Sequence, residues 1–306
     1  MRQISLPDGR SLDVVVDGDS GPAVFFHHGS PAAAESFPPL VAAARDAGLR
    51  WVSATRPGYG ASTRRPGRSV ADNCADVEAV LNELGVQSFI AMGWSGGGPH
   101  ALACGALLAP RCVGVVTLGG VAPWDVAQRE GFDWLAGMGP ENHEEFGAAL
   151  RGEADLRGFL DPLLPGLQQI EGPALAEALG GLVDDVDRAA LTGEFADNLA
   201  AAFREAVRLG VDGWVDDDLA FARDWGFELS AVHAPVSLWQ GADDRMVPYA
   251  HGSFLVDRLP NVRAHLLPGE GHVSIPLSRL ADIYADVRDF LGAAATTPRT
   301  SRPSAG

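Results

Sequence analysis

Short apolar runs alternate with longer amphipathic segments along most of the chain. The apolar runs, each long enough for a buried strand, lie at residues 23–27, 51–54, 89–92, 113–118, 236–239 and 264–267. The segments with helical periodicity lie at residues 37–47, 69–84, 97–108, 249–259 and 277–291. Strands that alternate with helices favour parallel pairing, with helices on both faces of the sheet.

The two ends of the chain have different patterns. Residues 4–16 form two alternating runs around Pro7-Asp8-Gly9-Arg10, which predicts a β-hairpin. With the hairpin, the pattern predicts an α/β fold: a mostly parallel, doubly wound sheet of about eight strands. Residues 294–306 are rich in Thr, Pro, Ser and Arg, and we expect a disordered tail there.

One long segment interrupts the alternation. Residues 124–229 contain no run that predicts a strand, and Ala, Leu, Asp, Glu and Gly dominate them. We therefore predict a first core part at 1–123, a helical insertion at 124–229, a second core part at 230–293 and the tail at 294–306. The acidic runs within the insertion, at 184–185 and 216–218, could attract an amine, but we expect them to form solvated faces.

Composition excludes some classes of function. The formal net charge is -17, which disfavours nucleic acid as a partner because such binding depends on Lys and Arg at phosphates. No apolar run approaches the roughly 20 residues that span a bilayer, and the first residues lack the apolar core of a signal peptide. We therefore expect a cytoplasmic protein without a membrane partner. The 3 cysteines show no paired spacing, so we expect no disulfide framework and no metal site.

The stretch AMGWSGGGPH at residues 91–100 places Ser95 between Gly93 and Gly97. In a chain with 37 glycines, the pattern Gly-x-Ser-x-Gly alone is a weak signal. Its context is stronger, because Ser95 directly follows a predicted strand and directly precedes a predicted helix. A sharp turn between the two would force the serine to positive φ and would need small residues on either side. The pattern thus predicts an exposed serine nucleophile.

A serine nucleophile needs a base and an acid that orients the base. His272 lies in a glycine-rich loop after the predicted strand at 264–267, and Asp243 and Asp244 follow the strand at 236–239. Loops at the carboxyl edge of a parallel sheet converge, so these residues can meet Ser95. The chain order Ser, Asp, His fits one hydrolase architecture, and at this stage either aspartate fits.

An acyl transfer also needs hydrogen-bond donors for the oxyanion. One such donor is the N–H of the residue after the nucleophile, here Gly96. The second comes from a loop after an earlier strand, and His28-Gly29-Ser30-Pro31 follows the strand at 23–27.

With these pieces in place, the chain resembles the α/β-hydrolase fold superfamily, and most of all its lid-bearing serine esterase and peptidase members. The resembling stretches are HHGSP at 27–31, TRPGYGAS at 55–62, GWSGGG at 93–98, GADDRMVP at 241–248 and GEGH at 269–272. The resemblance implies that Ser95 is the nucleophile, His272 the base and Asp244, rather than Asp243, the acid. It also implies that the backbone N–H groups of Ser30 and Gly96 bind the oxyanion.

The same resemblance implies that the insertion is a lid over the substrate pocket. We expect His28, Trp94 and Trp124 to line that pocket.

We therefore expect a serine hydrolase, carboxylesterase-like, that cleaves an ester, thioester or lactone of a small apolar substrate through an acyl-enzyme. The resemblance implies no cofactor and no metal. Three alternatives stay open: an aminopeptidase similar to proline iminopeptidases, a carbon–carbon hydrolase or lyase, and a ligand receptor without turnover. The aminopeptidase would need a buried lid carboxylate for the substrate's amine, and Ser30 and Gly96 depart from the HGGPG and GxSWG motifs of that group. The oligomeric state stays open.

Overall fold

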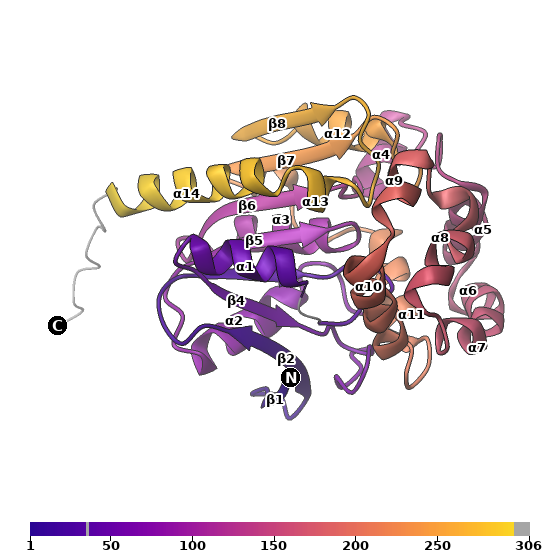
Figure 1. Cartoon of the computed structure of the whole chain (residues 1–306), viewed down its shortest axis with the longest axis horizontal. Coiled ribbons are helices and arrows are strands. Elements are labelled where there is room, and N and C mark those ends of the chain that lie inside the picture. The colour runs from indigo at the N-terminus through magenta and orange to yellow at the C-terminus, as the bar shows by residue number, and fades with distance from the viewer. Residues whose placement is uncertain (35–36, 297–306) are drawn as a thin grey trace.

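Eight strands form one sheet among the residues that the computed structural model describes, 1–34 and 37–296. Their order across the sheet is β1-β2-β4-β3-β5-β6-β7-β8 (Figure 1). The strands are β1 Arg2–Ser5, β2 Ser11–Asp17, β3 Ala23–His27, β4 Arg50–Ala54, β5 Phe89–Trp94, β6 Cys112–Leu118, β7 Val236–Gly241 and β8 Val262–Leu267. The β1–β2 and β2–β4 pairs are antiparallel, and every other pair is parallel. The predicted mostly parallel sheet and its N-terminal hairpin are confirmed.

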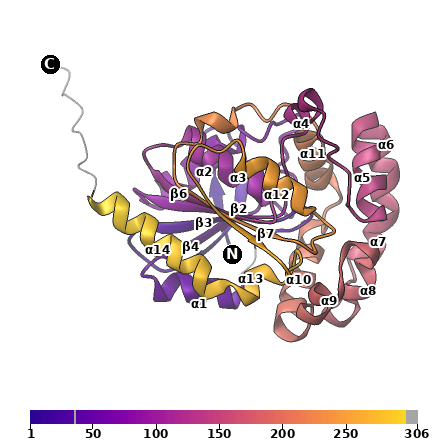
Figure 2. The ribbon, with the colours of Figure 1, turned by 90° about the horizontal axis from the view of Figure 1, so that it is seen from above.

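Helices cover both faces of this sheet (Figure 2). One face is covered by α1 Pro38–Asp46, α13 Ile275–Ser278 and α14 Leu280–Thr296. The other face is covered by α2 Asn73–Glu83, α3 Gly97–Leu107 and α12 Tyr249–Val256. The strand residues alternate between the two faces, as a pleated strand requires: Val24 and Phe26 pack with the first group of helices, and Phe25 packs with the second.

The chain between β6 and β7 is helical in all its regular elements, and every residue of it is described. The helices are α4 Trp124–Glu130, α5 Pro140–Arg151, α6 Glu153–Leu160, α7 Leu164–Leu167, α8 Leu175–Ala178, α9 Asp185–Ala190, α10 Gly193–Ala206 and α11 Asp212–Phe221. Short 3-10 turns lie at Asp161–Leu163, Gly172–Ala174, Gly180–Leu182 and Leu229–Ala231. In Figure 1 most of these helices lie beyond the carboxyl ends of the strands, where they stand over the strand-to-helix loops. We call residues 124–229 the inserted segment; its boundaries as a domain stay a prediction.

The C-terminal helix differs from its prediction at both ends. The segment expected as one helix at 277–291 is two helices, α13 and α14, that meet at Arg279. Helix α14 continues to Thr296, so the predicted tail begins too early: 294–296 are helical. Alanine has the highest helix propensity, and the run of alanines before Thr296 extends the helix. The rest of the predicted tail, 297–306, lies outside the described residues.

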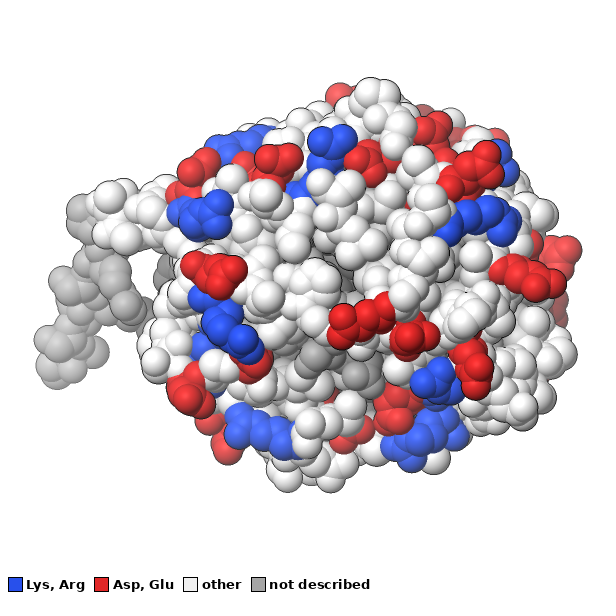
Figure 3. All heavy atoms as spheres, in the orientation of Figure 1, with Lys and Arg blue, Asp and Glu red and all other residues white. Residues whose placement is uncertain are grey.

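Acidic and basic side chains intermingle over the face of the molecule shown in Figure 3. Within the described ranges 1–34 and 37–296, no helix combines the length and the apolar character that a membrane crossing requires.

Candidate active site

Ser95 lies at the turn between β5 and α3. Its φ is +56°, and it is the one non-glycine residue with positive φ in the described part of the chain. A Cβ atom on Gly93 would lie 2.2 Å from the carbonyl oxygen of Gly97, and a Cβ on Gly97 would lie 2.0 Å from that of His27. Both glycines are therefore sterically required. The Ser95 N–H donates to the carbonyl of Leu118 at 2.8 Å, which fixes the turn against β6.

Asp244 and His272 form a buried hydrogen-bonded pair. The distance from His272 Nδ1 to Asp244 Oδ2 is 2.8 Å. Asp244 Oδ1 accepts the backbone N–H groups of Met246 and Val247, at 2.9 and 2.7 Å, so the carboxylate is held in one orientation. The neighbouring Asp243 is exposed. The structure thus brings Asp244, and not Asp243, to the imidazole.

The other ring nitrogen of His272 is free to act. Its Nε2 atom is buried and has no hydrogen-bond partner among the described residues, and His272 and Ser95 line the same cavity. The Trp94 indole lies beside the imidazole, with ring centroids 6.0 Å apart, and its N–H donates to the His272 carbonyl. Burial disfavours the imidazolium, but the Asp244 carboxylate outweighs it, and the pKa of His272 is raised above its ordinary value.

A second carboxylate, Asp187 on α9 of the inserted segment, holds the His272 loop. It is fully buried and accepts the backbone N–H groups of His272, Val273 and Ser274 at 2.8, 2.7 and 3.0 Å. A Cβ atom on Gly271 would lie 2.4 Å from this carboxylate, so the loop needs glycine to approach it. The sequence does not single out Asp187, because nothing local distinguishes it from the nearby Asp184 and Asp185.

The loop after β3 lies directly against the Ser95 turn. A Cβ atom on Gly29 would lie 3.4 Å from the Ser95 Cβ, and one on Gly96 would lie 2.6 Å from the Ser30 Oγ. The predicted oxyanion donors, the N–H groups of Ser30 and Gly96, therefore belong to two segments in contact beside Ser95.

His28 fixes this loop as a neutral side chain. Its Nδ1–H donates to the carbonyl of Gly29 at 2.8 Å, and its Nε2 accepts the backbone N–H of Arg56 at 3.0 Å. Burial and the Arg56 charge hold the pKa of His28 well below its usual range, in agreement with this tautomer. His28 also lines the cavity, as predicted.

A buried ion pair joins the same loop to α11. Arg56 donates to the carbonyls of His28 and Gly29 at 2.5 and 2.8 Å, and to Asp217 at 2.6 Å. Asp217 also accepts the hydroxyl of Ser30 at 2.6 Å. Asp217 is fully buried, and so is its run of three aspartates at 216–218; the expectation of a solvated face there is wrong. For Asp217 the reason is that the buried Arg56 and Arg68 compensate its charge, a pairing that the sequence cannot show.

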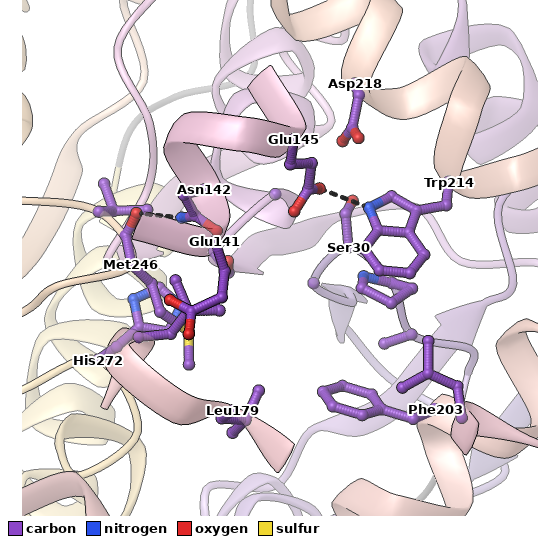
Figure 4. Close-up of a pocket in the computed structure, with 18 of the residues that line it drawn as sticks. Ser30, Glu141, Asn142, Glu145, Leu179, Phe203, Trp214, Asp218, Met246 and His272 are labelled. Carbon is purple, nitrogen blue, oxygen red and sulfur yellow. Dashed lines mark hydrogen bonds between the residues drawn. The ribbon is translucent and has the colours of Figure 1, made fainter. Parts of the chain in front are cut away.

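The loops and the inserted segment enclose a cavity of about 750 Å³. Ser95, His272, Ser30, Gly96, His28 and Trp94 all line it. Its walls are mainly apolar and come largely from the inserted segment; their aromatic side chains include Phe146, Phe159, Phe203, Trp214 and Phe221. Figure 4 shows two of these side chains, Phe203 and Trp214.

Trp124 is not among the residues that line this cavity, so its assignment to the pocket is corrected. It packs edge-on against the buried Trp134, with ring centroids 5.6 Å apart, because α4 directs it into the hydrophobic cluster on one face of the sheet. Over the described ranges, no cluster of three or more His, Cys, Asp or Glu side chains is arranged to hold a metal ion.

The fold, the strained serine turn and the Asp–His pair at the sheet edge define a class of protein. The model of the alpha/beta hydrolase fold family matches residues 22–277, and the chain belongs to this family.

Among curated proteins, the chain is 26% identical to a non-heme haloperoxidase of Rhodococcus erythropolis, over 90% of this chain and 94% of that protein. Among solved structures it is similar to a thermophilic esterase of Thermogutta terrifontis, with a TM-score of 0.65, 17% identity and coverage of 97% and 100%. It is also similar to a bromoperoxidase of Bacillus anthracis, with a TM-score of 0.66, 21% identity and coverage of 95% and 100%. At these identities the structural likenesses show the fold.

Proposed function

We propose that the protein is a serine hydrolase that cleaves an ester, thioester or lactone of a small, mainly apolar substrate through an acyl-enzyme. The observation that supports this most is the buried, unpartnered Nε2 of His272 in the cavity that Ser95 also lines. A buried nitrogen without a hydrogen-bond partner lowers the stability of the fold, so it calls for an explanation such as a partner that it engages during a reaction. The Ser95 hydroxyl is that group in this proposal.

In the proposed reaction, His272 Nε2 takes the hydroxyl proton of Ser95 while Ser95 Oγ attacks the carbonyl carbon. The N–H groups of Gly96 and Ser30 stabilise the oxyanion that forms. The imidazolium then gives its proton to the leaving group, at oxygen for an ester or lactone and at sulfur for a thioester. The carbonyl reforms, and the product is an acyl-serine. Water, deprotonated by the same Nε2, attacks the acyl-serine, and the proton returns to Ser95 as the acid departs.

Asp244 has a supporting role in this scheme. Its Oδ2 accepts the Nδ1–H of His272, which leaves Nε2 as the basic nitrogen and stabilises the imidazolium that forms in each step. Since two backbone N–H groups hold the other oxygen, the carboxylate keeps its orientation throughout.

The cavity supports the choice of substrate. Its volume of about 750 Å³ suits a small organic molecule, and its apolar walls suit an acyl chain rather than a polar or polymeric substrate. One relative of the chain is named a non-heme haloperoxidase. We would therefore assay haloperoxidase activity in parallel, by adding hydrogen peroxide and bromide to the ester assay.

Labelling with a fluorophosphonate tests the nucleophile. We expect the wild type to be labelled at Ser95 and the Ser95→Ala variant to be unlabelled. A matched control is Ser237→Ala, because Ser237 is a buried serine on β7 that hydrogen-bonds Asp286 and does not line the cavity. Equal labelling of wild type and Ser95→Ala, or no labelling of either, contradicts the proposal.

A series of p-nitrophenyl esters of increasing chain length then tests turnover. We expect hydrolysis that depends on Ser95, with kcat/KM rising with acyl length until the cavity is filled. A protein that is labelled at Ser95 but hydrolyses no ester would instead favour the receptor or the carbon–carbon hydrolase.

A further inference from the structure

Two carboxyl groups of the inserted segment meet in the wall of the cavity. Glu145 comes from α5 and Asp218 from α11, and their side chains point toward one another in Figure 4. Glu145 Oε1 accepts the indole N–H of Trp214 at 2.7 Å, which fixes its position. Asp218 is 1% exposed, and its Oδ2 atom has no hydrogen-bond partner among the described residues.

No described Lys, Arg or His forms an ion pair with Glu145 or Asp218. Burial, and then the Glu145 charge, raise the pKa of Asp218 well above its ordinary value, and burial also raises the pKa of Glu145. Such a pair retains one proton between its two carboxyl groups and one negative charge. Among the described residues that line this cavity there is no Lys or Arg, whereas Glu141 and Glu144 add further acidic groups to it.

The adjacent Asp217, in contrast, forms ion pairs with two arginines. It is equally buried, yet Arg56 and Arg68 hold its pKa well below the usual range. Asp217 points away from the cavity toward these two arginines, whereas Asp218 lines the cavity. Asp217 thus has ion-pair partners on its side of α11, whereas Asp218 faces the cavity.

The pair lies close to the serine turn. Phe221 follows Asp218 by three residues on α11, so the two side chains are neighbours on that helix. The Phe221 ring tip lies 3.1 Å from the position of a Cβ on Gly96. The pair is therefore about one helical turn, or about 5 Å along the axis, from a side chain that contacts the turn. Since Ser95, Glu145 and Asp218 all line the same cavity, one bound molecule can contact the pair and the serine together.

We propose that Glu145 and Asp218 form a subsite for the ammonium group of a substrate whose acyl carbonyl lies at Ser95. The ammonium N–H groups donate to the unpartnered Asp218 oxygen and to Glu145, and the proton that the pair shares leaves to solvent. The substrate class is then an ester, thioester or lactone with a primary amine a few carbons from the carbonyl. The preference for hydrolysing amine-bearing substrates rests on the proposed function, but the binding of an ammonium group to Glu145 and Asp218 does not.

Binding is therefore measured without turnover, in the full-length Ser95→Ala variant by calorimetry. The probes are n-butylammonium chloride and its neutral analogue butan-1-ol. We expect n-butylammonium to bind at least about tenfold more tightly, as charge-assisted hydrogen bonds to buried carboxylates imply. Its affinity rises with pH as the pair loses its proton. Equal affinity for the two probes overturns the proposal.

Isosteric variants in the same background locate the effect. Asp218→Asn and Glu145→Gln each weaken n-butylammonium binding about tenfold and leave butan-1-ol binding unchanged. Glu177→Gln is the matched control, because Glu177 on α8 is an exposed glutamate of the inserted segment that does not line the cavity, and we expect less than about a twofold change. Loss of affinity for both probes in the two variants, or an equal loss in the control, contradicts an ammonium subsite.

A kinetic comparison separates the two proposals. With wild-type protein, kcat/KM for p-nitrophenyl 3-aminopropanoate exceeds that for the isosteric butanoate, and Asp218→Asn removes the difference. If hydrolysis depends on Ser95 but shows no preference for the amine-bearing ester, the ammonium subsite is refuted and the proposal of a serine hydrolase stands. Tight n-butylammonium binding without hydrolysis of either ester refutes the hydrolase and leaves the subsite.

Discussion

Ser95 adopts its positive φ because its neighbours leave room for the turn and its backbone is fixed on both sides. Its own N–H bonds to Leu118, and its carbonyl accepts the N–H of Gly98 at 2.9 Å. A positive φ in a residue with a Cβ costs about 1 kcal/mol or more, so the packing around the turn must offset it. Gly97 provides the closest of these contacts.

We therefore predict that Gly97→Ala lowers the free energy of unfolding by about 2 to 3 kcal/mol and abolishes fluorophosphonate labelling. The added methyl would meet the carbonyl oxygen of His27, which is backbone of β3 and cannot rotate away. Urea denaturation and labelling measure the two effects. Gly292→Ala in α14 is the control, since a Cβ there meets nothing within 4 Å, and it should stabilise slightly. Normal labelling of Gly97→Ala would refute the steric account.

His272 sets the pH dependence of the proposed reaction. Only the neutral imidazole can accept the Ser95 proton, and the pKa of His272 is raised by Asp244. Activity is therefore full above this raised pKa and is lost as the pH falls through it. We predict that the acid limb of kcat/KM lies above about 6.5, the ordinary value for histidine.

Asp244→Asn removes the charge that favours the imidazolium. We predict that it moves the acid limb to lower pH and lowers kcat by about 10⁴. The pH dependence of labelling measures the limb even where turnover is slow. A limb that stays in place in this variant would mean that another group controls the pH dependence.

At the scale of elements, α9 connects the inserted segment to the His272 loop. Asp187 accepts three backbone N–H groups of the His272 loop, and its charge adds to that of Asp244 in raising the pKa of His272. We predict that Asp187→Asn lowers kcat/KM by about tenfold or more, since an amide nitrogen would face a backbone donor. It also moves the acid limb to lower pH. Asp185→Asn, on the same helix but exposed, should change neither, and an equal effect there would refute the role of Asp187.

Helix α11 connects the inserted segment to the loop after β3 through Asp217. Removing this carboxylate leaves the buried cations Arg56 and Arg68 without their partner. We predict that Asp217→Asn lowers the free energy of unfolding by about 3 to 5 kcal/mol, as for other broken buried pairs. Asp125→Asn, which breaks a surface pair with the exposed Arg129, should cost less than about 1 kcal/mol. Urea denaturation compares them, and similar losses would refute the argument.

At the scale of the whole molecule, the sequence predicted what local patterns determine. The alternation of apolar runs predicted the sheet, and the glycines around Ser95 predicted the turn, because both depend on residues adjacent in the chain. Asp187, Asp217 and Asp218 were not predicted as contact residues. Their partners lie far away in sequence; Arg56 and Asp217, for example, are 161 residues apart. A run of aspartates on a helix is typical of a solvated surface, and only the fold shows which of them face buried arginines, backbone N–H groups or the cavity.

The acidity of the molecule has two parts with different effects on a charged substrate. The net charge of -17 acts from the surface, and salt screens it beyond about 10 Å at about 0.1 M. Among the carboxyl groups that line the cavity, those of Glu145 and Asp218 are buried and therefore shielded from solvent ions. An anionic acyl group should therefore be rejected by the cavity at any salt concentration.

We predict that kcat/KM for mono-p-nitrophenyl succinate is at least about tenfold lower than for p-nitrophenyl butanoate, because the added carboxylate would lie among like charges. Raising the salt from about 0.05 to about 0.5 M should narrow this ratio only slightly, since screening reaches surface charges and not enclosed ones. Asp218→Asn should narrow it at both salt concentrations. If the two esters differ in kcat/KM at low salt but not at high salt, the discrimination comes from the surface charge. If their kcat/KM values are equal already at low salt, the cavity does not select by charge.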